Sequence, residues 1–482
     1  MAISDWRLAS GGWRVAMTGL MDRDLPVFEA AEFARWVEGL AQALPPHFQG
    51  VSHDSRRIRA GSLYVAIKGE RFDGHTFVAQ ALREGAAAAM VDAGWQAPTG
   101  ASALPLIIVR ETRRALADAA AAWRRRLKGL VIGVTGSSGK TTVKEMAAAF
   151  LGAGGPVCAT CGNLNNDLGL PLSVLAMRAD DAFGVFEMGS NHPGEIAALA
   201  EKARPDGAII TNVGCAHIGN FGSIDAIARE KGALFAALPP DGFAVVSREC
   251  ERFETVAGQS RARLVTVSLA RDDADFFGEL IDPVEGVLRA VETATGSTTR
   301  LRSGLPGEHN AENLLLAFAA ARTAGINPAA AAQALDKLIM PAMRWSVCRH
   351  GGVTVVNDAY NANPQSMKAV IRTFMRQPVA GRKILVLGDM LELGGQTEAL
   401  HREIGNFAAG HAPDLLVAVG DAAGRFLADA AVKSGLCSAK VVCYADALQA
   451  KAVREVLGAG DTVLLKASRG VGLERILDEW QV

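Results

Sequence analysis

Apolar runs of four to six residues recur through the middle of the chain, and helical patterns separate most of them. Such runs, bounded by polar turns, are typical of buried strands. Strands that alternate with helices predict a parallel sheet whose faces are covered by helices. The predicted strands of this region span residues 130–134, 184–188, 208–213, 243–246 and 264–267.

The last part of the chain repeats the same alternation, which predicts a second doubly wound sheet of the Rossmann-like kind. In such sheets ligands bind beyond the carboxyl ends of the strands, so polar residues directly after the apolar runs are the first candidates for chemistry. The predicted strands of this region span residues 353–356, 383–387, 415–419, 441–444 and 462–465.

Two other regions have a different pattern. Short apolar runs and polar turns alternate over residues 26–110, which predicts a small α/β unit, and an Ala-rich helix follows at 112–127. Between residues 272 and 302 the runs are short and alternate in polarity, which predicts an inserted antiparallel meander before a helix at 310–321.

The chain has 482 residues, a length that predicts three domains at about 150 residues each. We therefore expect an α/β protein of three domains. The predicted boundaries give a small α/β N-terminal domain at residues 1–112, a central parallel-sheet domain at 113–340 and a C-terminal Rossmann-like domain at 341–482.

Composition narrows the class of protein. Hydrophobic residues make up 49% and charged residues 21%, as in a globular protein, and the formal net charge of -1 offers no broad basic surface for nucleic acid or anionic membrane. Residues 1–10 lack the order of a secretory signal, and no apolar run reaches membrane-spanning length. Seven scattered cysteines favour a reducing compartment, so we expect a cytoplasmic protein. We also expect a monomer that does not insert into a membrane.

A phosphate-binding loop is predicted where the strand at 130–134 runs through a Gly/Ser turn into a helix. Glycines let backbone N–H groups close around phosphate oxygens, Lys140 can reach the outer phosphates, and Thr141 can offer a hydroxyl to Mg²⁺. The general motif has glycine where Val134 stands, so a functionless turn at a helix start is the alternative. The residues predicted to bind the phosphates here are Gly136, Ser137, Ser138, Gly139, Lys140, Thr141 and Thr142.

Other polar residues follow the neighbouring strands. Glu187 ends an apolar run and can bind Mg²⁺, Asn212 and His217 follow the next run, and Lys231 lies on a helical stretch. Taken one at a time, these residues are more often solvated charges or structural side chains. A nucleotide site alone also suits a switch, a motor or an enzyme.

In combination and in order, these motifs resemble those of the Mur ligase family over nearly the whole chain. The family's loop T-G-x-x-G-K-(S/T)-(S/T) matches residues 135–142, and its asparagine-rich segment, with Asn166, matches residues 163–171. The resemblance implies ATP and Mg²⁺ as cofactors, Mg²⁺ ligation by Glu187 and His217, and a carbamylated Lys231 that adds an anionic oxygen ligand. Lys140 would then act on the phosphates during catalysis.

Further segments carry the resemblance into the remaining parts of the site. Asn310 is similar to the family's adenine-side asparagine, and Arg344 to the arginine that the third domain brings to ATP, although Ala342 and Met343 stand where a glycine is usual. Residues 52–56 and 68–75 resemble the family's segments that hold the UDP end of the substrate, and their charged and hydroxyl side chains can bind a pyrophosphate. The candidate substrate-binding residues are Ser52, Ser55, Arg56, Lys68, Asn166, Asn361, Asn363 and Asp389.

The third-domain segments at 357–367, 387–394 and 466–470 are similar to the branch of the family that adds D-alanyl-D-alanine to UDP-N-acetylmuramoyl-tripeptide. The Asp-Asn-Pro-Arg string of the diaminopimelate-adding branch is not found. The resemblance implies an ATP-dependent amide ligase that works through an acyl phosphate and closes its domains to exclude water. Another ligase of the family, amino-acid-adding or folylpolyglutamate-like, and a P-loop regulatory ATPase are the alternatives.

Overall fold

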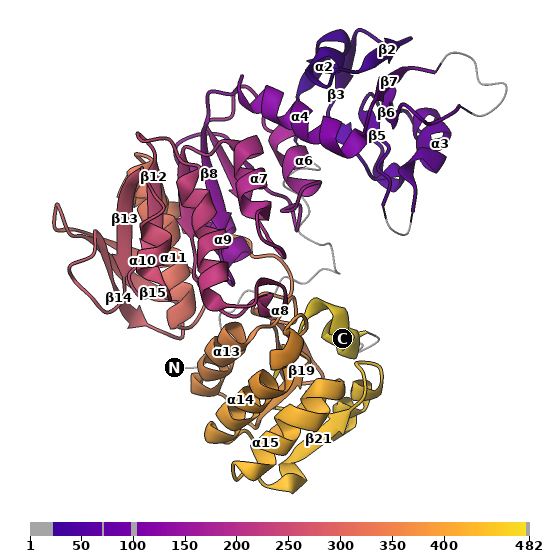
Figure 1. Cartoon of the computed structure of the whole chain (residues 1–482). Helices are drawn as coiled ribbons and strands as arrows, with labels where there is room; N and C mark the ends of the chain where they lie inside the picture. Colours follow the sequence, from indigo (N-terminus) through magenta and orange to yellow (C-terminus); the bar gives the residue numbers. More distant parts are fainter. Residues whose placement is uncertain (1–22, 70–71, 98–103, 479–482) are drawn as a thin grey trace.

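The computed structural model describes residues 23–69, 72–97 and 104–478. The chain forms three α/β parts in sequence order, each built on its own main sheet, as predicted (Figure 1). In Figure 1 the indigo N-terminal part lies at one end, the magenta middle part lies between, and the orange to yellow part lies at the other end. Within the described residues, no helix combines the length and the apolar character that crossing a membrane requires.

The N-terminal part is a five-stranded sheet in the order β2-β7-β6-β5-β4, beside a two-stranded sheet of β1 and β3. Its central strands are buried, and the pairing of β4 through β7 is parallel. The strands are β1 (Val27–Glu29), β2 (Leu40–Gln42), β3 (His47–Gln49), β4 (Val51–Ser52), β5 (Leu63–Val65), β6 (Ala88–Asp92) and β7 (Leu106–Val109). The helices are α2 (Ala30–Trp36), η1 (Ser55–Arg57), η2 (Gly74–Phe77) and α3 (Val78–Arg83).

The middle part has a nine-stranded sheet in the order β16-β15-β14-β13-β12-β11-β8-β10-β9. All five predicted strands are present and pair in parallel, and the predicted antiparallel meander is formed by the last three strands. The strands are β8 (Leu130–Thr135), β9 (Val157–Ala159), β10 (Phe183–Glu187), β11 (Gly207–Ile210), β12 (Phe243–Ser247), β13 (Arg263–Ser268), β14 (Phe276–Asp282), β15 (Val287–Glu292) and β16 (Ser297–Arg302).

One predicted strand of this sheet was too long. The expected strand at 208–213 ends at Ile210. The backbone N–H of Thr211 still donates to Thr135, but the side chains of Thr211 and Asn212 hydrogen-bond the phosphate loop, and the strand goes no further. The helices of the middle part are α4 (Thr112–Arg124), α5 (Lys140–Leu151), α6 (Gly169–Leu175), α7 (Glu195–Ala203), α8 (Ile218–Phe221), α9 (Ile224–Ala236), α10 (Phe253–Ala257), α11 (Glu308–Thr323), α12 (Pro328–Ala334) and η3 (Leu335–Lys337).

The third part has a six-stranded sheet in the order β17-β18-β22-β19-β20-β21, parallel except for the edge strand β17. The strands are β17 (Ser346–His350), β18 (Val353–Asn357), β19 (Lys383–Gly388), β20 (Leu415–Val419), β21 (Val441–Tyr444) and β22 (Thr462–Lys466). The helices are α13 (Pro364–Arg376), η4 (Gly394–Gln396), α14 (Thr397–Gly410), η5 (Ala423–Leu427), α15 (Ala428–Lys433), η6 (Ser438–Lys440), η7 (Gln449–Val456), η8 (Arg469–Val471) and η9 (Leu473–Leu477).

Helix α4 joins the first two parts. On one side Trp123 packs against Phe28, with ring centroids 5.0 Å apart, and on the other its Nε1 donates to the carbonyl of Met177 at 2.8 Å. Among the basic residues at the end of α4, Arg125 and Arg126 are exposed, but Arg124 is only 7% exposed and donates to Asp206 at 2.8 Å. Arg124 therefore fixes α4 to the middle part.

Candidate active site

A cavity of about 1270 Å³ lies where the middle and third parts meet. The carboxyl ends of β8, β10 and β11 supply its floor, α11 one wall and α13 another, which is where ligands bind in parallel α/β sheets. The phosphate loop lies within this cavity. Most predicted nucleotide and metal residues line the cavity, namely Ser137, Ser138, Gly139, Lys140, Thr141, Thr142, Glu187, His217, Asn310 and Arg344.

The two glycines of the loop have conformations that other residues rarely adopt. Gly136 has a φ of 147°, and a Cβ there would lie 1.9 Å from the Oγ1 of Thr211. Gly139 has a φ of 78°, and a Cβ there would lie 2.6 Å from the Oδ1 of Asn313. Both positions thus require glycine, which explains the loop motif by sterics.

The segment after β11 fixes the shape of the loop. The Oδ1 of Asn212 accepts from the backbone N–H of Ser138 at 3.0 Å, and the hydroxyl of Thr211 donates to the Ser138 carbonyl at 2.5 Å. The Ser137 hydroxyl donates to the carbonyl of Gly214 at 3.0 Å. The loop is therefore held in one conformation before any ligand is considered.

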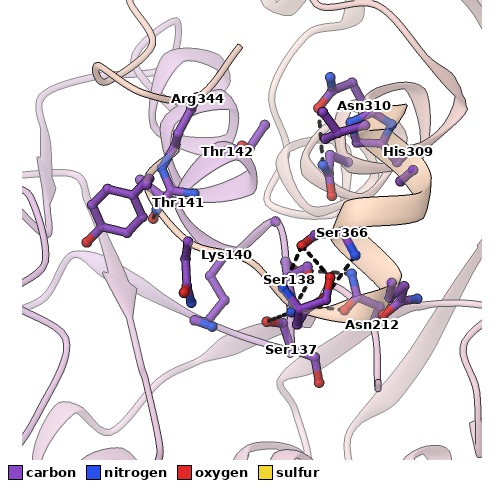
Figure 2. Close-up of a pocket in the computed structure, with 18 of the residues that line it drawn as sticks. Ser137, Ser138, Lys140, Thr141, Thr142, Asn212, His309, Asn310, Arg344 and Ser366 are labelled. Carbon is purple, nitrogen blue, oxygen red and sulfur yellow. Dashed lines mark hydrogen bonds between the residues drawn. The ribbon is translucent and has the colours of Figure 1, made fainter. Parts of the chain in front are cut away.

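Lys140, labelled in Figure 2, begins α5 and lies within the loop. Its Nζ donates to the carbonyl of Gly136 at 2.7 Å. Burial lowers the pKa of the Lys140 ammonium, the charge of Arg344 lowers it further, and Glu187 acts in the opposite direction. A cation in this position is poorly solvated and stabilised by few anions, so it favours an anionic ligand.

Glu187 is the centre of a second group of contacts. Its Oε2 accepts from the hydroxyl of Thr141 at 2.7 Å, and its Oε1 accepts from the side chain of Asn165 at 2.6 Å. The same Thr141 hydroxyl accepts from Arg344 at 2.7 Å (Figure 2). Arg344 also stacks on Tyr360 at 4.2 Å. The third part of the chain therefore contributes a cation directly to the phosphate loop.

Without a glycine before Arg344, the backbone on either side of Arg344 adopts a strained conformation that hydrogen bonds hold in place. Met343 has a φ of 61° and Trp345 a φ of 52°, so the backbone keeps a left-handed turn that glycine would adopt more easily. The hydroxyl of Ser346 accepts from the backbone N–H of Met343 at 3.1 Å, and Asp358 accepts from that of Trp345 at 2.8 Å. These bonds hold Arg344 in place without the glycine.

His217 and Lys231 lie near the loop in the middle part. The Nδ1 of His217 is hydrogen-bonded to Glu392 of the third part, and burial lowers the pKa of His217. Lys231 is 2% exposed and its Nζ donates to Ser190 at 2.6 Å. Burial, followed by the charge of Lys140, lowers the pKa of Lys231 to about 7.

The donors fit Mg²⁺ unequally. Among the described residues, no three His, Cys, Asp or Glu side chains gather into a ready-made metal cluster. Mg²⁺ prefers oxygen ligands and commonly uses one or two carboxylates with phosphate oxygens and water. Glu187 and Thr141 suit that pattern. His217 offers nitrogen, a less usual ligand, and Lys231 can ligate only after its amine has been converted to an anion.

The N-terminal end of α11 lines the far side of the cavity. Asn310 donates to the carbonyl of Pro306 at 2.8 Å, which orients its amide, and Leu269 and Leu305 add apolar surface there. His309 lies beside Asn310, and burial lowers its pKa to about 4 (Figure 2). Apolar walls with a few amides suit a flat base next to a phosphate site.

Two predicted substrate residues of the third part reach the cavity and one does not. Asn363 donates to the hydroxyl of Ser138 at 2.9 Å and caps α13, while Asn361 lines the cavity and its carbonyl accepts from Lys466 at 3.0 Å. Asp389 lies outside the cavity lining and accepts from the backbone N–H of Ala423 at 2.7 Å. Asn166 also lines the cavity, where its Oδ1 accepts from Gly169 N–H at 2.9 Å.

The predicted UDP-side residues lie apart from this cavity, at the ends of β4 and β5 in the N-terminal part. Ser52 ends β4 and Ser55 begins η1, whereas Lys68 lies three residues beyond β5. The side chain of Arg56 is 84% exposed and pairs with Asp54 at 2.8 Å. Glu70 and Arg71 of the predicted string lie outside the described residues.

Several contacts in the site were not predicted. Asn165 rather than Asn166 bonds Glu187, and the quoted asparagine-rich segment was the signal for it. Ser190 bonds Lys231, but a single serine after a strand gives no such signal. The contact of Glu392 with His217 and the bond of the buried Lys466 to Asp358, at 2.6 Å, depend on how the third part folds and docks.

Three family sequence models match the chain in order. The model of the Mur ligase family catalytic domain matches residues 47–124, that of the Mur ligase middle domain residues 134–321, and that of the Mur ligase glutamate ligase domain residues 343–469. Together they cover most of the described chain.

Curated relatives and solved structures match over similar spans. The UDP-N-acetylmuramoyl-tripeptide–D-alanyl-D-alanine ligase of Bacillus subtilis (strain 168) is 37% identical over 444 residues, covering 89% of this chain and 92% of the relative. That of Escherichia coli (strain K12) is 33% identical over 455 residues, covering 92% and 95%. MurF from Acinetobacter baumannii superposes with a TM-score of 0.83 at 29% identity, covering 95% of this chain and 99% of that one. The Thermotoga maritima MurF ligase in complex with ADP gives 0.74 at 29% identity, covering 89% and 96%.

Three α/β parts, with a phosphate loop in a cavity where the middle and third parts meet, define a nucleotide-binding enzyme. More narrowly, the chain belongs to the Mur ligase family and is a ligase.

Proposed function

We propose that this enzyme uses ATP to join D-alanyl-D-alanine to UDP-N-acetylmuramoyl-tripeptide, giving the UDP-linked pentapeptide for peptidoglycan. The single observation that carries the proposal is the convergence of Thr141, Glu187 and Arg344 beside Lys140, with Arg344 coming from the third part. The names and coverage of the relatives from Bacillus subtilis and Escherichia coli support the choice of substrates.

The reaction has two balanced steps. The terminal carboxylate of the tripeptide attacks the γ-phosphorus of ATP, the bond to ADP breaks, and an acyl phosphate forms. The amine of D-alanyl-D-alanine then attacks the acyl carbon, phosphate leaves with the bonding electrons, and the nitrogen loses its proton. Positioning and charge neutralisation dominate phosphoryl transfer, and Lys140 and Arg344 supply positive charge for it.

Mg²⁺ and ATP are the proposed cofactors. When bound, Mg²⁺ would neutralise charge on the outer phosphates, and Thr141, Glu187 and His217 would hold it. We also propose that Lys231 is carbamylated: its amine attacks the carbon of CO₂ and loses a proton, which leaves an anionic oxygen ligand. Its burial and its single bond to Ser190 support a role other than that of an exposed lysine.

The remaining assignments complete the proposal. Residues 1–112 are the proposed UDP-substrate domain, in which Ser52, Ser55, Arg56 and Lys68 bind the UDP end. Residues 113–340 are the proposed ATP domain, in which Asn310 binds the adenine base and Asn166 the peptide. Residues 341–482 are the proposed domain that receives D-alanyl-D-alanine. Asn361, Asn363 and Asp389 are the proposed dipeptide-side residues, and Asp389 would act by holding the start of η5 through its bond to the Ala423 N–H. We further propose a cytoplasmic monomer.

Product analysis tests this function. The full chain is incubated with ATP, Mg²⁺, UDP-linked tripeptide and D-alanyl-D-alanine, and ADP and the joined pentapeptide are measured by mass spectrometry. Equimolar ADP and pentapeptide are expected. Ligation of single amino acids instead of the dipeptide would indicate another branch of the family, and ATP turnover that ignores every UDP-linked peptide would indicate a regulatory ATPase.

A further inference from the structure

The segment after β19, residues 389–394, reaches across the domain boundary to α8. Glu392 makes two hydrogen bonds to this segment of the middle part. Its carboxylate accepts from the imidazole Nδ1 of His217, and its backbone carbonyl accepts from the N–H of Gly219 at 3.3 Å. Figure 1 places α8 at the boundary between the middle part and the orange third part. We call residues 389–394 the docking loop.

Two glycines form the contact beneath the hydrogen bond of His217 with Glu392. A Cβ on Gly219 would lie 2.8 Å from the backbone N of Gly394 and 3.1 Å from the carbonyl of Glu392. A Cβ on Gly394 would lie 2.9 Å from the Cα of Gly219. The two backbones therefore meet at a distance that only glycine permits on either side. An incidental hydrogen bond between surface side chains would need no such fit.

The docking loop is fixed within its own domain. His401 is fully buried, its Nε2 accepts from the backbone N–H of Met390 at 3.0 Å, and its Nδ1 donates to the carbonyl of Thr397 at 2.7 Å. Ser468 accepts from the N–H of Leu391 at 2.9 Å. These bonds hold Glu392 with a φ of 63°, a strained conformation for a residue other than glycine.

We propose that Glu392 is a positioning residue for His217, and that the third domain completes the Mg²⁺ site of the middle domain by docking. A carboxylate can only accept, so it fixes Nδ1 as the donor and leaves Nε2 as the lone-pair nitrogen of the ring. Carboxylates commonly orient metal-binding histidines in this way. This inference rests on the proposed function, in which His217 is a Mg²⁺ ligand.

The charge on Glu392 is tested by Glu392→Gln, with Glu398→Gln as the matched control. The two side chains are 51% and 58% exposed, but Glu398 pairs with Arg402 within the third domain. Calorimetric binding of Mg²⁺ to the full chain with ADP should weaken about 10-fold in Glu392→Gln and stay unchanged in Glu398→Gln. The Mg²⁺ concentration for half-maximal ADP release should rise by a similar factor, with a smaller change in KM for D-alanyl-D-alanine.

The backbone contact is tested by Gly219→Ala, which adds one methyl group at the interface and changes no charge. Gly395→Ala is the control, because a Cβ on Gly395 meets nothing within 4 Å. Small-angle scattering with ADP and Mg²⁺ should give a larger radius of gyration for Gly219→Ala only, and its Mg²⁺ binding should weaken as in Glu392→Gln.

Wild-type Mg²⁺ affinity in both Glu392→Gln and Gly219→Ala would overturn the inference, as would an equal loss in Glu398→Gln. These outcomes are distinct from failure of the proposed function, which would appear as absence of the pentapeptide product in the wild-type enzyme. The calorimetric and scattering measurements do not depend on that product.

Discussion

At the scale of single residues, the charges around the phosphate loop decide the chemistry. Lys140 is the cation nearest the loop carbonyls, and burial makes its charge costly without an anionic partner. Lys140→Ala should lower the rate of ADP release by about 10²- to 10³-fold, the range for removing one preorganised electrostatic group. Assays that quench the reaction at fixed times and quantify ADP measure this rate. Lys128→Ala changes an exposed lysine of the same domain and should leave the rate unchanged; a comparable loss there would contradict the specific role of Lys140.

His309 gives the site an acid sensitivity of its own. Burial lowers its pKa to about 4, opposed by Asp358 and assisted by Lys466 from the third part. A depressed pKa means that the unfolded chain binds more protons below pH 6.5, so stability falls as pH drops from about 6.5 towards 4. Relative to pH 7, this costs roughly 2 kcal/mol at pH 5. Thermal unfolding at both pH values should show a smaller acid-induced fall in Tm for His309→Gln than for wild type. An equal fall in both proteins would contradict this account.

At the scale of elements, the start of α5 combines backbone strain with close packing. Gly139→Ala would place a Cβ at a φ of 78° and 2.6 Å from Asn313, so it should lower stability by more than the about 1–2 kcal/mol of left-handed strain alone. Gly162→Ala is the matched control, with a φ of 56° and no neighbour within 4 Å. Denaturant unfolding measures the stability of both variants, and ADP binding measures whether the phosphate loop keeps its function. The second change Asn313→Ala should recover part of the loss in Gly139→Ala, and no recovery would show that strain rather than the clash is responsible.

The elements also show how far the sequence could predict the fold. Continuous apolar runs identified the buried parallel strands, because a strand covered on both faces needs hydrophobic residues throughout. Edge strand β17 was missed because its residues alternate between half-buried and exposed and form no continuous apolar run. Strand β9 was also missed, because it has only three residues. The loop, Glu187 and Arg344 were predicted from their motifs, whereas the pairing of His217 with Glu392, 175 residues away, depends on domain docking and has no local signal.

At the scale of the whole molecule, the two interfaces of the middle part differ in kind. The N-terminal part is attached through aromatic packing, with Phe28 and Trp36 against Trp123 of α4, and through a largely buried ion pair of Arg23 with Asp181 at 2.6 Å. The third part contacts the loop region through separate polar contacts, including Arg344 with Thr141 at 2.7 Å and Asn363 with Ser138 at 2.9 Å. Each polar contact contributes only about 0.5–1.5 kcal/mol net, because water competes for the same groups. The third part is therefore the one whose position a ligand can shift.

Energy transfer between dyes on different domains measures whether ligands move the N-terminal part or the third part relative to the middle part. One dye pair joins exposed positions 84 and 254, in the N-terminal and middle parts, and the other joins 254 and 433, in the middle and third parts. The dyes are attached without cysteine chemistry, since Cys437 and Cys443 are exposed. A non-hydrolysable ATP analogue with Mg²⁺ and UDP-linked tripeptide should raise the transfer efficiency of the second pair, because these ligands bind best where both domains contact them. The first pair should not change. A ligand-induced change in the first pair, or none in the second, would contradict the conclusion that ligands shift the third part and not the N-terminal part.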